Sequence, residues 1–125
     1  MTTLPLAALL TPATTGLFNK EMFAKMKRTA YFITVGRGKS TVTQDLIDAL
    51  KNGTIAGAGL DVTDPEPLPD GHPLFYAPNV IITPHMATAG AGSRGPRAWE
   101  VQRENMRRYI AGEKIFNVVD VKAGY

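Results

Sequence analysis

The chain has 125 residues, enough for one domain with a buried core, and its 44% apolar and 20% charged residues are typical of globular proteins. It contains no cysteine, which excludes a disulfide framework, a thiolate metal site and a thiol nucleophile, and a cytoplasmic location is expected. No basic residue precedes the apolar segment 4–10, so a signal peptide is not predicted, and no apolar run is long enough for a membrane span.

The net charge of +3 comes from one segment, residues 94–114, which carries six basic and three acidic residues. The remainder of the chain carries eight of each sign. Within the segment, opposite charges recur at helical spacing, as in Glu104 and Arg108, which is typical of a solvated helix face. No nucleic-acid reading motif accompanies these charges, so neither a nucleic acid nor a membrane is predicted as a partner.

The first predicted strand is the apolar run 6–10, which a turn-rich segment follows. Asn19 is the predicted N-cap of a short helix, because its side chain can accept a hydrogen bond from the first turn. The next apolar run, residues 30–35, is predicted as the second strand. The apolar side of the short helix consists of residues at helical spacing, namely Met22, Phe23 and Met26.

The second helix carries the clearest end signals in the chain. Thr43 is predicted as its N-cap, Lys51 lies in its last turn, and Gly53 is predicted as the residue just past its end. The third strand is predicted over residues 55–62, where the small residues 56–59 leave room for close approach of backbone or ligand. The predicted buried stripe of the second helix is Leu46, Ile47 and Leu50.

A proline-rich loop, residues 64–73, precedes a fourth predicted strand, 80–83, and a long helix that ends near Gly112. Apolar strands that alternate with helices indicate a parallel sheet covered on both faces. We therefore predict an α/β fold, a partial Rossmann-like doubly wound parallel sheet that lacks the first β-α-β unit with its glycine-rich loop. The glycines at 90–95 are a poor match to that loop, because they do not open a β-α-β unit.

Three polar residues lie just past the ends of predicted strands, namely Arg37, Glu66 and His85. The carboxyl ends of parallel strands form the edge of the sheet where α/β proteins hold their ligands. An arginine, a carboxylate and a histidine gathered there can bind an acid and move a proton. These residues are the candidate site.

Each residue of the candidate site also has a structural alternative. Arg37 could bind the carbonyl groups at strand ends, Glu66 could be a solvated loop acid, and His85 could cap a turn. The other histidine, His72, lies between glycine and proline and is predicted as a surface loop residue.

Four segments, in this order and spacing, resemble the D-isomer-specific 2-hydroxyacid dehydrogenases: 10–17, Met26-Lys27 with 30–38, 60–69 and 79–85. Residues 104–113 are similar to the closing helix of that family. The resemblance implies that residues 1–125 are the C-terminal portion of a dinucleotide-binding domain, present as a fragment or truncated chain. Strand and helix units would occupy 1–92, and a closing helix and tail would occupy 93–125.

The resemblance implies an NAD(P)-dependent oxidoreductase that interconverts small 2-hydroxy acids and 2-oxo acids. It makes His85 the acid–base residue, Glu66 its partner and Arg37 the residue that binds the substrate. The hydride would come from NAD or NADP, because no side chain supplies one. The residues that the resemblance places along the cofactor are Thr11, Gly36, Arg37, Asp61 and His85.

Two other functional classes stay open on the sequence. The chain could be a non-catalytic module that senses a dinucleotide or binds a partner, or an inactive remnant that self-associates. A formate-oxidising relative is disfavoured, because that branch carries glutamine where Glu66 stands. The first strand would be an exposed apolar edge, so we predict a homo-oligomer. Without the glycine-rich loop, we expect the chain alone to bind NADH weakly or not at all.

Overall fold

The computed structural model describes residues 2–87 and 96–122. The chain divides into two compact units, Met1–His85 and Met86–Tyr125. The boundary predicted between residues 92 and 93, like the glycine pattern at 90–95, lies outside the described residues. Within the described ranges, the helices are too short or too polar to cross a membrane.

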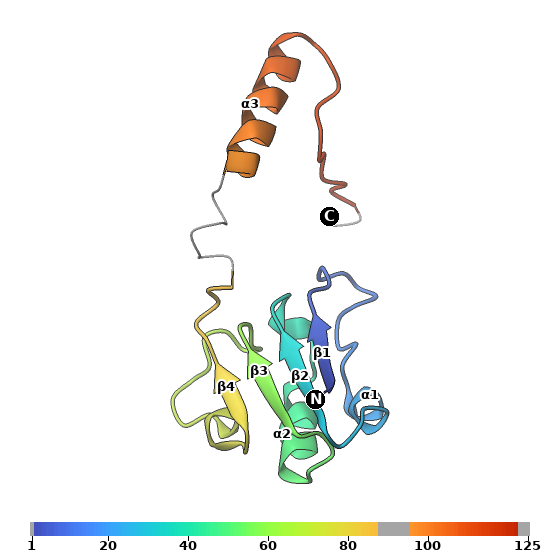
Figure 1. Ribbon diagram of the computed structural model, residues 1–125, viewed down its shortest axis with the longest axis vertical. Helices are drawn as coiled ribbons and strands as arrows, with labels where there is room; N and C mark the ends of the chain where they lie inside the picture. Colours follow the sequence, from blue (N-terminus) through green and yellow to red (C-terminus); the bar gives the residue numbers. More distant parts are fainter. Residues whose placement is uncertain (1, 88–95, 123–125) are drawn as a thin grey trace. The chain divides into compact units, whose positions relative to one another are not determined.

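The first unit contains a parallel four-stranded sheet in the order β1-β2-β3-β4 (Figure 1). Neighbours in the sheet follow each other in the chain, so all four strands end at the same edge. This arrangement confirms the predicted α/β fold with a parallel sheet. The strands are Thr2–Leu6 (β1), Ala30–Thr34 (β2), Gly57–Leu60 (β3) and Val80–Ile82 (β4).

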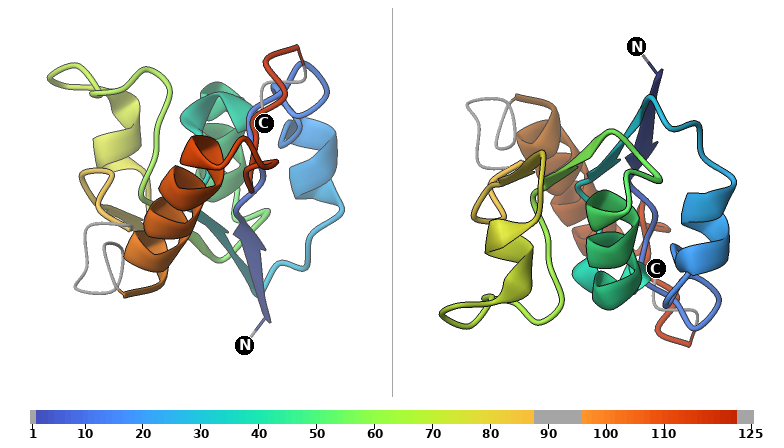
Figure 2. Two further views of the ribbon diagram at one scale, coloured as in Figure 1. Left: turned by 90° about the horizontal axis from the view of Figure 1, so that it is seen from above. Right: turned by 90° about the horizontal axis from the view of Figure 1, so that it is seen from below.

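The helical connections of this unit lie on one face of the sheet. Figure 2 shows α1, α2 and η2 on the same side of the strands, as expected when right-handed crossovers advance in one direction. We predicted cover on both faces, whereas these connections cover one, and Ile81 of β4 is 71% exposed. The connections are α1 (Lys20–Ala24), the 3₁₀ turn η1 (Gly38–Ser40), α2 (Thr43–Lys51) and the 3₁₀ turn η2 (Pro73–Tyr76).

The core of the first unit lies between the sheet and these helices. Phe32 of β2 is completely buried, and its ring lies 4.8 Å from that of Phe18 and 5.3 Å from that of Phe23, measured between centroids. Burial of such aromatic side chains contributes much of the hydrophobic stabilisation. The apolar faces predicted for α1 and α2 both contribute to this core, which confirms them: Met22, Phe23, Met26, Leu46, Ile47 and Leu50.

The predicted N-cap was right for α1 and wrong for α2. Asn19 caps α1, where its Oδ1 accepts a hydrogen bond from the N–H of Met22 at 3.1 Å. Val42 is the N-cap of α2, and Thr43 is the first helical residue. The Thr43 hydroxyl donates instead to the carbonyl oxygen of Asp64 at 2.6 Å. A tertiary hydrogen bond has therefore replaced the local cap and ties α2 to the loop after β3.

All four strands differ in extent from the prediction, and β2 and β4 each end one residue before their predicted ends at 35 and 83. The first covers Thr2–Leu6 instead of residues 6–10, because Leu6 is already paired with Thr34, the last residue of β2. Residues 7–10, although apolar, therefore lie past the end of the ladder. The third strand covers Gly57–Leu60, which is shorter than the predicted 55–62. For both β1 and β3, the pairing with β2 ends at Thr34, the last residue of β2.

The second unit contains α3 (Pro96–Ile110) and the tail that follows it. Glu104 accepts a hydrogen bond from Nε of Arg108 at 2.8 Å, and the guanidinium group of Arg108 also lies over the ring of Phe116 at 4.0 Å. The side chain of Asn105 bonds both the N–H and the carbonyl of Phe116. These contacts hold the start of the tail against the last turns of α3, and they confirm the solvated, charged helix face.

Candidate active site

Arg37 lies just past β2, between two glycines that allow neighbouring loops to approach closely. A Cβ atom on Gly36 would lie 2.7 Å from the carbonyl oxygen of Ala8, in the loop after β1. A Cβ atom on Gly38 would overlap the carbonyl oxygen of Thr63, in the loop after β3. Only glycine fits at such positions. The loops that follow three adjacent strands are thereby packed together around Arg37.

The side chain of Arg37 donates from Nη1 to the carbonyl oxygen of Gly36 at 2.8 Å. This is the contact expected of a structural arginine, the alternative raised by the sequence. A guanidinium group has five N–H donors in a planar fork, so one bond to a carbonyl does not saturate it. Arg37 can therefore make this contact and also bind an acid.

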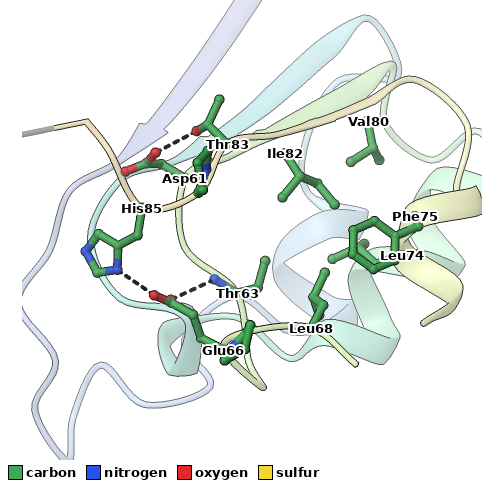
Figure 3. A pocket seen from close by; sticks show the side chains of 12 residues that line it. Asp61, Thr63, Glu66, Leu68, Leu74, Phe75, Val80, Ile82, Thr83 and His85 are labelled. Atoms are coloured by element: carbon green, nitrogen blue, oxygen red, sulfur yellow. Dashed lines mark hydrogen bonds and ion pairs between the residues drawn. The ribbon is translucent and has the colours of Figure 1, made fainter. Parts of the chain in front are cut away.

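His85 and Glu66 are in direct contact. His85 follows β4, Glu66 lies in the loop after β3, and His85 Nδ1 is 2.6 Å from Glu66 Oε1 (Figure 3). This hydrogen bond is the main reason why the pKa of Glu66 lies below its usual value, and desolvation of the carboxyl group acts against it. The positive charge of Arg37 lowers the same pKa as a smaller contribution. Glu66 is therefore ionised at neutral pH and orients the imidazole ring.

The backbone of His85 is in the left-handed region, with φ at +50°. A residue other than glycine is uncommon there, and the conformation costs about 1–2 kcal/mol. The N–H of His85 donates to the carbonyl oxygen of Thr83 at 3.0 Å, which closes a tight turn around Pro84. Unfavourable backbone conformations of this kind concentrate at functional sites, where the surrounding contacts maintain them.

Asp61 directly follows β3, and only 6% of its surface is exposed. Its Oδ1 accepts a hydrogen bond from the Thr83 hydroxyl at 2.6 Å (Figure 3). The N–H of Asp61 donates to the carbonyl oxygen of Thr34, and that of Thr83 donates to the carbonyl oxygen of Leu60. The ladder contacts therefore continue past the strands and place a buried carboxyl group beside the turn that carries His85.

A cavity of about 670 Å³ opens between β4, η2 and the proline-rich loop. Its size and its mixture of apolar and polar residues are typical of small-molecule and cofactor sites. The lining holds two carboxyl groups and neither lysine nor arginine, so it favours a neutral or cationic group over an acid. Polar residues lie at one side and apolar residues at the other (Figure 3): Asp61, Thr63, Glu66, Thr83 and His85, then Leu68, Leu74, Phe75, Val80 and Ile82.

The structure brings together three of the six predicted site residues. Glu66 and His85 touch each other, and Asp61 lines the same cavity. Gly36 and Arg37 lie past the neighbouring strand β2, in the loop cluster described above.

Thr11, the sixth predicted residue, lies in the loop after β1, where its hydrogen bonds are with its own turn. Its N–H donates to Thr14 Oγ1 at 2.7 Å, and the two hydroxyl groups are 3.2 Å apart. Thr83, which also lines the cavity, was not predicted as a site residue. Its position two residues before the candidate histidine, at the end of a strand, is the signal that would have identified it.

Known proteins of one family match the chain. A family model described as D-isomer specific 2-hydroxyacid dehydrogenase, NAD binding domain, matches residues 2–87. The human glyoxylate reductase/hydroxypyruvate reductase is 55% identical over 83 residues, which are 66% of this chain and 25% of that protein.

Solved structures are similar over nearly the whole chain. The D-isomer specific 2-hydroxyacid dehydrogenase from Xanthobacter autotrophicus, in complex with NADPH and MES, gives a TM-score of 0.85 at 44% identity and covers 98% of this chain and 50% of its own. The NADPH-dependent glyoxylate/hydroxypyruvate reductase from Sinorhizobium meliloti, in complex with NADP and sulfate, also gives a TM-score of 0.85, at 37% identity. The match covers 98% of this chain and 40% of that protein.

The chain thus spans between a quarter and a half of the length of these relatives. The family model, in contrast, matches well over half of the chain, and its match ends two residues after His85. The chain belongs to the D-isomer specific 2-hydroxyacid dehydrogenase family, to the part that the family model describes as the NAD binding domain.

Proposed function

We propose that this chain carries the acid–base part of an NAD(P)-dependent oxidoreductase that interconverts 2-hydroxy acids and 2-oxo acids. The observation that carries the proposal is the 2.6 Å contact between His85 and Glu66, beside the carboxyl ends of parallel strands. The same proposal makes residues 1–125 the C-terminal portion of a dinucleotide-binding domain, with strand and helix units at 1–92 and a closing helix and tail at 93–125.

His85 exchanges the proton in the proposed reaction. The Nδ1 atom of its ring faces Glu66, so Nε2 is the nitrogen available to a substrate. In reduction, Nε2–H gives its proton to the carbonyl oxygen of the 2-oxo acid, and in oxidation Nε2 takes the hydroxyl proton. The ionised Glu66 stabilises the cationic imidazole that precedes proton donation. A nicotinamide cofactor, when bound, would supply the hydride to the carbonyl carbon of the 2-oxo acid in reduction and would accept it from that carbon in oxidation.

Arg37 binds the carboxylate of the substrate in this proposal. A guanidinium group can bind a carboxylate through two parallel N–H bonds, which a lysine cannot reproduce. The cavity beside His85 is lined by carboxyl groups, so the substrate carboxylate is expected to turn away from Asp61 and toward Arg37. This division separates the acid end of the substrate from the carbon that reacts.

The residues that would hold the cofactor are those named from the sequence: Thr11, Gly36, Arg37, Asp61 and His85. The chemistry of the cavity supports the assignment for Asp61 and His85, which line it, because a buried carboxyl group such as that of Asp61 can accept an amide N–H. The cavity has an acidic, polar side and an apolar side, which suits a nicotinamide ring that is neutral in one redox state and cationic in the other. The proposed cofactor is NAD or NADP, since solved relatives are in complex with NADPH, NADP or NAD.

The proposed substrates are small 2-oxo acids such as glyoxylate and hydroxypyruvate. They are suggested by the names of the relatives, which include glyoxylate reductase/hydroxypyruvate reductase. A homo-oligomer and a cytoplasmic location belong to the same proposal. The absence of cysteine from the chain is consistent with that compartment.

A chimeric enzyme tests the function, because the chain spans only part of its relatives. This chain would replace the matching half of the Xanthobacter autotrophicus protein, since the structural match includes 98% of this chain. Oxidation of NADH and NADPH would be followed with glyoxylate and hydroxypyruvate as substrates. We expect turnover within about tenfold of the parent enzyme, since the pair of His85 and Glu66 is contained in the chain.

A folded chimera that binds dinucleotide without turnover would contradict the proposal and favour a non-catalytic binding module. The 125-residue chain by itself would be titrated with NADH in parallel, and weak or no binding is expected.

A further inference from the structure

Thr83 contacts both the buried Asp61 and the turn that carries His85. Its hydroxyl donates to Asp61 Oδ1 at 2.6 Å, and its carbonyl oxygen accepts from the N–H of His85 at 3.0 Å. Its own N–H donates to the carbonyl oxygen of Leu60 at 2.8 Å. One residue thus links the ends of β3 and β4 through both its backbone and its side chain.

We propose that Thr83 is a positioning residue, which holds the His85 ring against Glu66 through its hydrogen bond to Asp61. The inference deepens the proposed function of this site and rests on it. Thr83 itself need not touch a substrate.

The turn needs such a support because β4 is short and lies at the edge of the described sheet. It has three residues and pairs only with β3. His85 lies two residues after Thr83 in a left-handed conformation that its own backbone does not favour. A second link between the strand ends therefore limits the positions that the turn can adopt.

Asp61 is a firm anchor for this link. It is almost fully buried, and its N–H donates to the carbonyl oxygen of Thr34 in β2 at 2.9 Å. Contacts thus run from the interior of the sheet through Asp61 and Thr83 to His85. A reacting side chain that is supported from behind in this way keeps the geometry that proton transfer requires.

Two substitutions separate the hydroxyl group from the shape of the side chain. Thr83→Val keeps the branched shape and removes the donor, whereas Thr83→Ser keeps the donor and removes a methyl group. Nitrogen and proton NMR of the His85 ring in the 125-residue chain reports the hydrogen bond from Nδ1 to Glu66. We expect the His85 ring signals of T83S to match those of the original chain. In T83V, the chemical shift that marks an Nδ1 proton hydrogen-bonded to Glu66 should disappear.

Backbone amide signals of α2 provide the control for folding. If T83V does not fold, Asp61→Ala removes the same hydrogen bond from its other partner, and the same change in the His85 ring is expected. Unchanged ring signals in a folded T83V or D61A chain would overturn the inference.

The chimera adds a kinetic readout that a merely structural role would not produce. We expect T83V to lower kcat about tenfold with little change in KM for the 2-oxo acid, and T83S to recover most of the loss. A chimera without turnover whose chain still shows the NMR difference would reject the proposed function and leave the positioning role intact. An active chimera with unaltered kcat in T83V would reject the positioning role alone.

Discussion

The Nδ1 atom of His85 lies 2.6 Å from Oε1 of Glu66, although nineteen positions separate the two residues in the sequence. They meet because β3 and β4 are parallel neighbours, so the loops that follow them emerge at the same edge of the sheet. Both residues lie in exposed loops, and the contact between them fixes the orientation of the His85 ring.

Replacing His85 by glutamine should abolish most of the turnover of the chimera. General acid–base catalysis contributes about 10²–10⁴-fold, and glutamine cannot exchange a proton near neutral pH. The dissociation constant for NADH or NADPH should change far less than the turnover, because glutamine keeps a polar side chain beside the cofactor and removes only the exchangeable proton. Steady-state kinetics and a fluorescence titration measure the two quantities.

His72 is the matched control, since it is the other histidine of the chain. Its Nδ1 accepts from the N–H of Leu74 at the start of η2, and an asparagine can keep that cap. H72N should therefore retain turnover. Equal losses in H85Q and H72N would remove His85 from the mechanism.

Replacing Glu66 by glutamine should flatten the acid limb of the stability curve. The hydrogen bond with His85 lowers the pKa of Glu66 in the folded chain below the reference value of 4.5. The stabilisation is therefore complete above about pH 4.5, and it is lost as pH falls through the lower, folded-state pKa. The two side chains are 43% and 40% exposed, so solvent screening limits the effect to below about 1 kcal/mol.

Urea unfolding of the original chain and E66Q, at several values between about pH 3 and about pH 7, measures this difference. Parallel curves for the two proteins would show that the contact adds no pH-dependent stability.

Replacing Gly38 by alanine should destabilise the first unit severely. The added Cβ would overlap the carbonyl oxygen of Thr63, a backbone atom that cannot move without displacing the loop of Glu66. We expect a loss of at least about 3 kcal/mol in the free energy of unfolding.

Gly59→Ala is the control, because its Cβ would meet the Ile33 side chain at 3.8 Å, an ordinary contact. G59A should be close to neutral in the same urea experiment. If G38A were as stable as G59A, the close packing of the loops around Arg37 would be refuted.

Replacing Thr43 by valine should cost about 1–3 kcal/mol, because the carbonyl oxygen of Asp64 loses its donor. The loss should exceed that of an ordinary helix cap, since the bond joins α2 to the loop that carries Glu66. Thr43→Ser keeps the hydroxyl group and should retain most of the stability. Thermal unfolding followed by circular dichroism compares the variants, and equal midpoints for T43V and T43S would argue against the bond.

The chain should self-associate in solution. β1 forms one edge of the described sheet, and its residues 2–5 are exposed, which makes the edge a template for pairing with another chain. Size-exclusion chromatography with light scattering should give a mass above 13.5 kDa that rises with concentration. A constant monomer mass up to high concentration would contradict this expectation.

Local patterns in the sequence were sufficient to predict several elements. Asn19 was identified as a cap because its bond to Met22 lies within one helical turn. The buried stripe of α2 follows from its spacing, and Gly53 was expected past its end, where φ is +62°. The positions of Arg37, Glu66 and His85 could also be predicted, because each residue follows an apolar run closely in the sequence.

Contacts between distant segments were decided only by the tertiary structure. As an N-cap, the hydroxyl of Thr43 would accept from a backbone N–H of its own helix, whereas in the folded chain it donates to the carbonyl oxygen of Asp64, in the loop after β3. β1 covers Thr2–Leu6 because these residues are in register with Ala30–Thr34 of β2, whereas the hydropathy of the sequence had indicated residues 6–10. The bond between Thr83 and Asp61 joins residues that are 22 positions apart. The sequence by itself determined which residue types stand at the strand ends, whereas the sheet register decided which of them touch, because hydrogen bonding requires a geometry that only neighbouring strands provide.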